Sequence, residues 1–106
     1  MSKSGYCQLW LTCANKKEAN NIAKTLLVKR LVACAKQIPV NSDFRWKNNL
    51  EHNNEVLLIM ESKVDLFDKV ENEVAKLHSY ETFVLEASPV LKISQKAQAW
   101  LEKEIK

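Results

Sequence analysis

The stretch Ile38–Glu51, IPVNSDFRWKNNLE, decides the fold of this 106-residue chain. Phe44 and Trp46 alternate with polar and charged residues, as in a β-strand with one apolar face. Residues 47–54, KNNLEHNN, are rich in asparagine and predict a turn. Glu55–Ser62, EVLLIMES, is β-prone and predicts the returning strand. The pattern therefore predicts a long hairpin whose two aromatic residues need a surface to cover them.

The chain before this hairpin predicts a strand, a helix and a second strand. Tyr6–Thr12, YCQLWLT, is short, apolar and β-prone. Asn15 and Glu18 have the spacing of a capping box, so a helix should begin there and end near Arg30. Its apolar face follows the i, i+3, i+4 spacing through Ala19, Ile22, Ala23, Leu26 and Leu27. The strand Leu31–Pro39 should then bend at its proline, because proline cannot donate to a central ladder.

After the hairpin, Ser62 and Asp65 have the spacing of a second capping box. The buried stripe of the helix that follows is Phe67, Val70, Val74 and Leu77. Glu81–Val90, ETFVLEASPV, predicts the last main strand, and Ser94 should cap a C-terminal helix. This order predicts an α+β fold, a ferredoxin-like βαββαβ sandwich with an extra C-terminal helix. At this length, residues 1–106 should form a single domain.

One face of the predicted sheet lacks a helix to cover it. Cys7, Leu9 and Leu11 share one parity on the first strand, so Trp10 should point to the uncovered side. Together with the hairpin aromatics, Trp10 predicts an apolar face that packs against a partner, since monomers rarely leave large contiguous apolar patches in water.

Composition argues against several classes of protein. The 16 basic and 13 acidic residues leave a net charge of +3, and the basic residues form no block, which argues against nucleic-acid binding. An RNA-binding module of the RRM kind is the main rival with this fold, but it needs an aromatic RNP1-like strand that the chain lacks. A single glycine leaves no glycine-rich phosphate loop, and no catalytic arrangement is readable, so we expect no enzyme.

The expected compartment is the cytoplasm. No apolar run approaches the roughly 20 residues of a membrane span, and the N-terminal residues lack a leader-like pattern. The three cysteines, Cys7, Cys13 and Cys34, are odd in number and lack C-x-x-C spacing, which indicates reduced thiols in a reducing compartment.

Five segments together resemble the CutA family of divalent-ion tolerance proteins. They are LTCANKKEANNIAKTLLVKRLVACAKQIP (11–39), SDFRWKNNLE (42–51), EVLLIMES (55–62), LHSYET (77–82) and AWLEKEI (99–105). The resemblance implies a ferredoxin-like protomer in a homotrimer, in which the hairpin reaches neighbouring subunits and other copies cover its aromatics. It also implies a role in tolerance of copper and other divalent metals, a trimer like that of the PII signalling proteins, and room for a small ligand or protein partner. A structural trimer without metal function is the alternative.

Candidate site residues follow from this resemblance. His78, Glu81 and Cys34 are candidate ligands for a metal ion, although His78 can instead cap a helix and Cys34 can be a small buried hydrophobe. The residues expected at an inter-subunit cleft or interface are Phe44, Trp46, Glu61 and Tyr80. Leu11 and Leu77 stand where some family members have a cysteine and a histidine. We therefore expect weak copper(II) binding and no metal requirement for folding.

Overall fold

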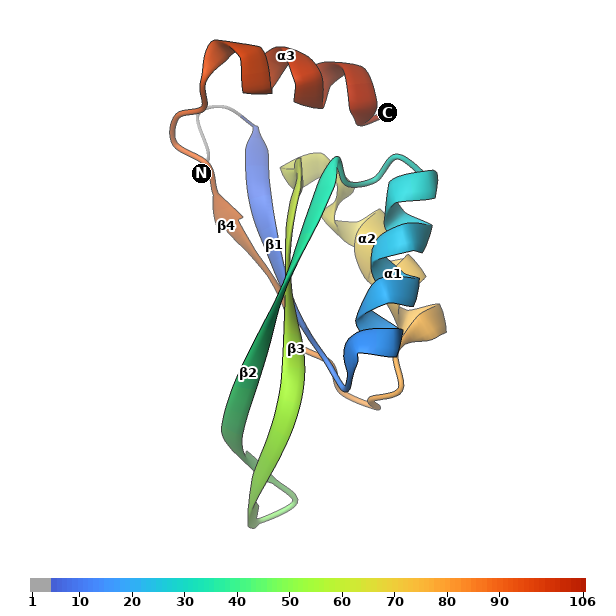
Figure 1. Cartoon of the computed structure of the whole chain (residues 1–106), viewed down its shortest axis with the longest axis vertical. Coiled ribbons are helices and arrows are strands. Elements are labelled where there is room, and N and C mark those ends of the chain that lie inside the picture. The colour runs from blue at the N-terminus through green and yellow to red at the C-terminus, as the bar shows by residue number, and fades with distance from the viewer. Residues whose placement is uncertain (1–4) are drawn as a thin grey trace.

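The computed structural model describes residues 5–106, which form a four-stranded antiparallel sheet and three α-helices (Figure 1). The elements are β1 (Tyr6–Cys13), α1 (Lys16–Val28), β2 (Cys34–Trp46), β3 (Asn49–Lys63), a 3-10 turn (Val64–Leu66), α2 (Phe67–Leu77), β4 (Leu85–Pro89) and α3 (Gln95–Glu104). The strand order is β2-β3-β1-β4, and every neighbouring pair is antiparallel. The predicted ferredoxin-like α+β fold with an extra C-terminal helix is confirmed.

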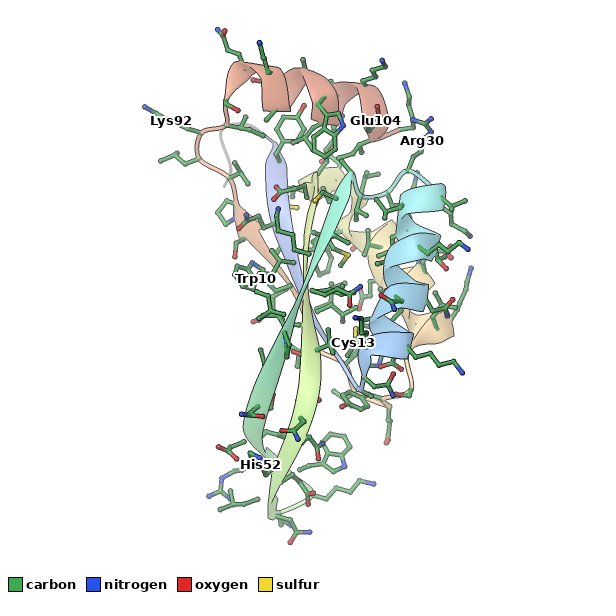
Figure 2. The ribbon with its side chains drawn as sticks, in the orientation of Figure 1. Trp10, Cys13, Arg30, His52, Lys92 and Glu104 are labelled. Atoms are coloured by element: carbon green, nitrogen blue, oxygen red, sulfur yellow. The ribbon has the colours of Figure 1, made fainter. Side chains whose placement is uncertain are left out.

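The core lies between the sheet and the two helices that cover one of its faces, α1 and α2 (Figure 1). Alternate residues of β1 and β3 point to these helices and are buried, while Trp10 lies on the side away from them (Figure 2). The fully buried side chains on this covered face are Cys7, Leu9, Leu11, Cys13, Leu58 and Met60, and the helices add Ile22, Leu26, Val70 and Val74. The alternation of side chains predicted for β1 therefore decides which of its residues lie in the core.

Helix α1 begins as predicted. The Asn15 side chain accepts a hydrogen bond from the backbone N–H of Glu18 at 2.9 Å. The Glu18 carboxylate reaches back to the N–H of Ala14 at 2.8 Å, one residue earlier than in a standard capping box. The helix ends at Val28, and Arg30 has a φ of 59°, in the left-handed region that helix C-termini commonly use.

The predicted second capping box is wrong. Ser62 lies inside β3, is fully buried, and its hydroxyl donates to the carbonyl of Leu31 at 2.7 Å. Chain entry into α2 uses the 3-10 turn instead, and no side chain caps that helix. The last strand is also shorter than predicted, because β4 pairs with β1 only from Leu85 to Pro89. Helix α3 does begin after Ser94, but the serine hydroxyl makes no capping bond.

The hairpin is longer and its turn tighter than predicted. Only Lys47 and Asn48 form the turn, with φ angles of 50° and 68°, as in the two-residue turns whose twist matches paired strands. Residues 49–54 were expected in the turn but belong to β3, since their backbone pairs with β2 up to Asn49. Pro39 does not interrupt β2, because β2 lies at the edge of the sheet.

The other face of the sheet, here called the open face, is left uncovered by α1 and α2, and α3 crosses only its end beside Tyr6 (Figure 1). Its partly or largely exposed apolar residues are Trp10, Ile38, Val40, Phe44, Trp46, Leu57, Ile59 and Val84. None of the helices within residues 5–106 is long and apolar enough to cross a membrane.

Candidate functional site

The segment after α2 folds against the base of the hairpin and forms a pocket on the open face. The hydroxyl of Tyr80 donates to the carboxylate of Glu55, a buried residue of β3. Around this pair lies a hollow of about 380 Å³, here called the Tyr80 pocket. Its lining residues are Thr12, Ser42, Phe44, Arg45, Trp46, Glu55, Tyr80, Thr82 and Val84. A second hollow of about 360 Å³ shares Phe44, Trp46, Tyr80 and Thr82 with it.

The Tyr80 pocket has aromatic walls and a polar base. Burial, and next the hydrogen bond to Glu55, raise the pKa of Tyr80 above its ordinary value, so the phenol stays protonated. Arg45 adds a cation at the rim. The lining residues include no histidine, cysteine or lysine, and their one carboxylate, Glu55, accepts the hydrogen bond of Tyr80. A hollow of this size with aromatic walls and a few polar groups can accommodate a small polar molecule.

His78 connects the segment after α2 to the end of β1. Its side chain is 0% exposed. Nε2 lies 2.9 Å from the carbonyl of Thr12, which can only accept, and Nδ1 accepts from the backbone N–H of Tyr80 at 3.1 Å. The ring also stacks on Phe83, with centroids 5.3 Å apart. Both nitrogens are therefore occupied, with Nε2 as a donor and Nδ1 as an acceptor.

Glu18 and Cys13 complete a buried cluster with His78. The ligand-type atoms of these three side chains lie within 4.8 Å of one another, which is close enough for a metal ion. Glu18, however, already accepts from the N–H groups of Ala14 at 2.8 Å and of Ser79 at 2.6 Å. Burial opposes ionisation of Glu18, but those hydrogen bonds outweigh it and lower its pKa. The carboxylate therefore serves as a capping group.

The thiol of Cys13 is equally unsuited to ligation. Burial, followed by the nearby carboxylates of Glu18 and Glu55, raises its pKa to about 12. Metals bind the thiolate, which is scarce at such a pKa. Since the Glu18 and His78 atoms are already hydrogen-bonded to backbone groups, the cluster does not fit a resident metal ion. Sequence reasoning missed Cys13 and Glu18, although the predicted topology already placed the end of β1 beside the start of α1.

The three predicted ligands do not come together within one chain. Cys34 begins β2 and pairs with Glu61. Cys13, which lies beside His78, is level with Pro39 of β2. Pro39 follows Cys34 by five residues, so the backbone of Cys34 lies roughly 16 Å from the level of Cys13, at about 3.3 Å per residue. Glu81 is exposed. Glu61, predicted at the interface, lies 3.6 Å from Lys36 and 3.4 Å from Gln8, away from the Tyr80 pocket. Phe44, Trp46 and Tyr80, by contrast, do meet.

Comparison with known proteins identifies the family. A model of the CutA1 divalent ion tolerance protein family matches residues 7–104. The chain belongs to this family. The CutA protein of Archaeoglobus fulgidus, named a divalent-cation tolerance protein, is 31% identical over 97 residues, which cover 92% of this chain and 95% of that protein. Human protein CutA is 35% identical over 82 residues, which are 76% of this chain but only 46% of the human protein.

Solved CutA structures share the fold across nearly the whole chain. The A. fulgidus structure, described as a periplasmic divalent cation tolerance protein CutA, superposes with a TM-score of 0.93 at 30% identity and covers 95% of this chain and 99% of that one. The structure of the divalent cation tolerance protein from Thermus thermophilus gives a TM-score of 0.91 at 26% identity, with 95% and 99% coverage. The long hairpin and the C-terminal helix are therefore features that this chain shares with CutA proteins.

Proposed function

We propose that this chain acts in divalent-cation tolerance as a self-assembled homotrimer rather than as an enzyme or a tight metal carrier. The observation that carries the proposal is the open face of the sheet. Ile38 is 43% exposed, Trp46 39% and Val84 55%, on a face that no helix covers between Trp10 and the hairpin turn. Apolar surface of this extent is typical of an interface.

The projecting hairpin supports assembly independently. Beyond the level of Cys13, β2 and β3 pair only with each other, through residues 40–46 and 49–55 (Figure 1). A two-stranded ribbon is marginally stable alone in water, so a partner surface along it would stabilise it.

A trimer is the form we propose because the two edges of the sheet differ. The edge strands are β2, with 13 residues, and β4, with 5. A hairpin that crosses onto the neighbouring copy makes a head-to-tail contact, and head-to-tail contacts close into rings when the rotation permits. Three copies would place the open faces toward a shared centre, where the indole N–H of Trp10, buried and without a partner among residues 5–106, would find an acceptor.

Metal and compartment complete the proposal. We propose that no metal ion is needed for folding, because the buried cluster of Cys13, Glu18 and His78 is satisfied by the protein itself. Copper(II) would bind weakly.

We also propose a reducing compartment such as the cytoplasm, on the ground that Cys7, Cys13 and Cys34 are unpaired. The Tyr80 pocket would bind a small ligand at the subunit boundary, in the manner of PII-like signalling proteins.

The assembly is tested by light scattering coupled to gel filtration of the metal-free protein. We expect a mass about three times the 12.2 kDa of one chain, unchanged by a chelator. A monomer would overturn the assembly. The tolerance role is tested separately, by growth in excess copper of cells that lack the endogenous protein and carry this chain. Unchanged copper sensitivity would contradict that role even if the trimer were present.

A further inference from the structure

The chain has two histidines, and the structure places them in opposite situations. The His78 side chain is 0% exposed with both ring nitrogens hydrogen-bonded to backbone groups. The His52 side chain is 62% exposed and lies on the part of the hairpin that projects away from the helices (Figure 2). An incoming metal ion therefore reaches His52 without breaking the fold, whereas it reaches His78 only by displacing two hydrogen bonds.

His52 is also oriented for ligation by a carboxylate across the strand pair. Asp43 of β2 faces His52 of β3 directly, and Asp43 Oδ1 lies 2.5 Å from His52 Nδ1. The carboxylate accepts the Nδ1 proton, which leaves the lone pair of Nε2 available, and Nε2 forms no hydrogen bond within residues 5–106. Metal-ligating histidines typically have this arrangement, because the carboxylate fixes the tautomer and raises the basicity of the other nitrogen.

The surroundings of the pair leave room for a hydrated ion. A hollow of about 380 Å³ lies beside it, lined by Asp43, Phe44, Arg45, Leu50, Glu51 and His52. Glu51 and Asp43 supply negative charge, and Arg45 is the opposing cation. The described residues offer one imidazole nitrogen and carboxylate oxygens, so water must fill the remaining positions and the site is open rather than closed.

We propose that His52, oriented by Asp43, is the copper(II) site of this chain. Copper(II) leads the divalent first-row ions in affinity for nitrogen and oxygen donors, so zinc should bind more weakly. The inference locates the weak copper binding proposed above. Asp43 and His52 alternate with Phe44 along the hairpin, so they lie on the face opposite the apolar residues that the proposed trimer would cover. It also differs from the sequence-based expectation, which put the metal at His78.

The experiment titrates metal-free protein with copper(II) and records the electron paramagnetic resonance spectrum. Wild-type protein should show nitrogen superhyperfine coupling from one imidazole. His52→Asn should remove that coupling and weaken binding by about tenfold or more, and Asp43→Asn, which keeps the imidazole but loses the carboxylate, by about tenfold. His78→Asn is the matched control and should leave the coupling intact. All variants keep the same chain ends, so copper bound there contributes equally to each.

A second readout does not depend on any variant. In ¹H–¹⁵N correlation spectra, substoichiometric copper(II) should broaden the resonances of residues 41–54 first and leave those around His78 sharp. The inference is overturned if His52→Asn binds copper(II) like the wild type, if His78→Asn loses the imidazole coupling, or if broadening begins at His78. A protein that proves monomeric but still loses copper with His52→Asn would contradict the trimer and support the site.

Discussion

The covered and open faces of the sheet are built from the same strands, and they differ in what one chain can complete by itself. On the covered face, Leu9, Leu11 and Leu58 are fully buried, and even the polar Ser62 donates its hydroxyl to a backbone carbonyl. On the open face, neighbouring residues of the same strands, such as Trp10 and Leu57, keep part of their apolar surface in solvent. We therefore expect the stability of the fold to depend mainly on the first face and the proposed association to use the second.

The largest effect should come from a charge on the covered face. In Leu58→Lys an ammonium group would replace a fully buried leucine of β3, with the buried Leu11 as its cross-strand neighbour. Burial of an unpaired charge costs much of the about 5–15 kcal/mol by which a domain is stable. We expect no cooperative thermal transition by circular dichroism. A variant that unfolds cooperatively near the wild-type temperature would mean that Leu58 is not in the core.

The adjacent residue provides the matched test of the open face. Leu57→Lys places the same charge one position away, opposite Thr12 on the uncovered side. We expect a folded chain with wild-type far-ultraviolet circular dichroism but a mass near 12.2 kDa by light scattering. If Leu57→Lys kept the assembled mass, the open face would not be the interface. If it unfolded like Leu58→Lys, the two faces would not be separable.

A smaller effect concerns the polar groups that close the covered face beside His78. The pKa of Glu18 is lowered from its ordinary 4.5, so its stabilisation of the fold is complete above that pH and is lost as pH falls through the lowered value. Glu18→Gln should cost about 1.5–3 kcal/mol at pH 7, the range for a hydrogen bond to a charged group, and less in acid. Urea unfolding at pH 7 and pH 3 measures this. The exposed Glu81→Gln is the control, and an equal loss at both pH values would contradict the argument.

Sequence patterns predicted those features that depend on near neighbours. The parity of Cys7, Leu9 and Leu11, the capping box at Asn15 and the order of elements all follow from spacing along one strand or helix. The hairpin turn was misplaced because asparagine favours turns and is uncommon in strands, yet residues 49–54 are rich in it and form a strand. Asn54 instead pairs with Asn41 in the ladder. Ser62 was misread since its spacing to Asp65 matches a cap, while its true partner, Leu31, is distant in sequence.

The candidate sites were harder to predict because they join distant segments. The contact of Tyr80 with Glu55 and that of His78 with Thr12 depend on how the loop after α2 packs on the sheet. The pairing of Asp43 with His52 required only the correct turn, since a two-residue loop at 47–48 fixes every cross-strand neighbour of the hairpin. An error of a few residues in the turn was therefore enough to hide the pair.

The hydrogen bond between Tyr80 and Glu55 links the ionisation of a tyrosine to unfolding in alkali. The chain has two tyrosines, and both phenols resist ionisation while it is folded. Burial, and then the hydrogen bond to Glu102, raise the pKa of Tyr6 to about 12, and the pKa of Tyr80 is raised too, by burial first and by Glu55 second. Stability from these groups is intact below the ordinary value of 10 and declines as pH rises toward the folded values. Tyrosinate absorption in the near-ultraviolet should therefore appear in a single step with loss of structure, which gives an optical measure of folding without any added probe.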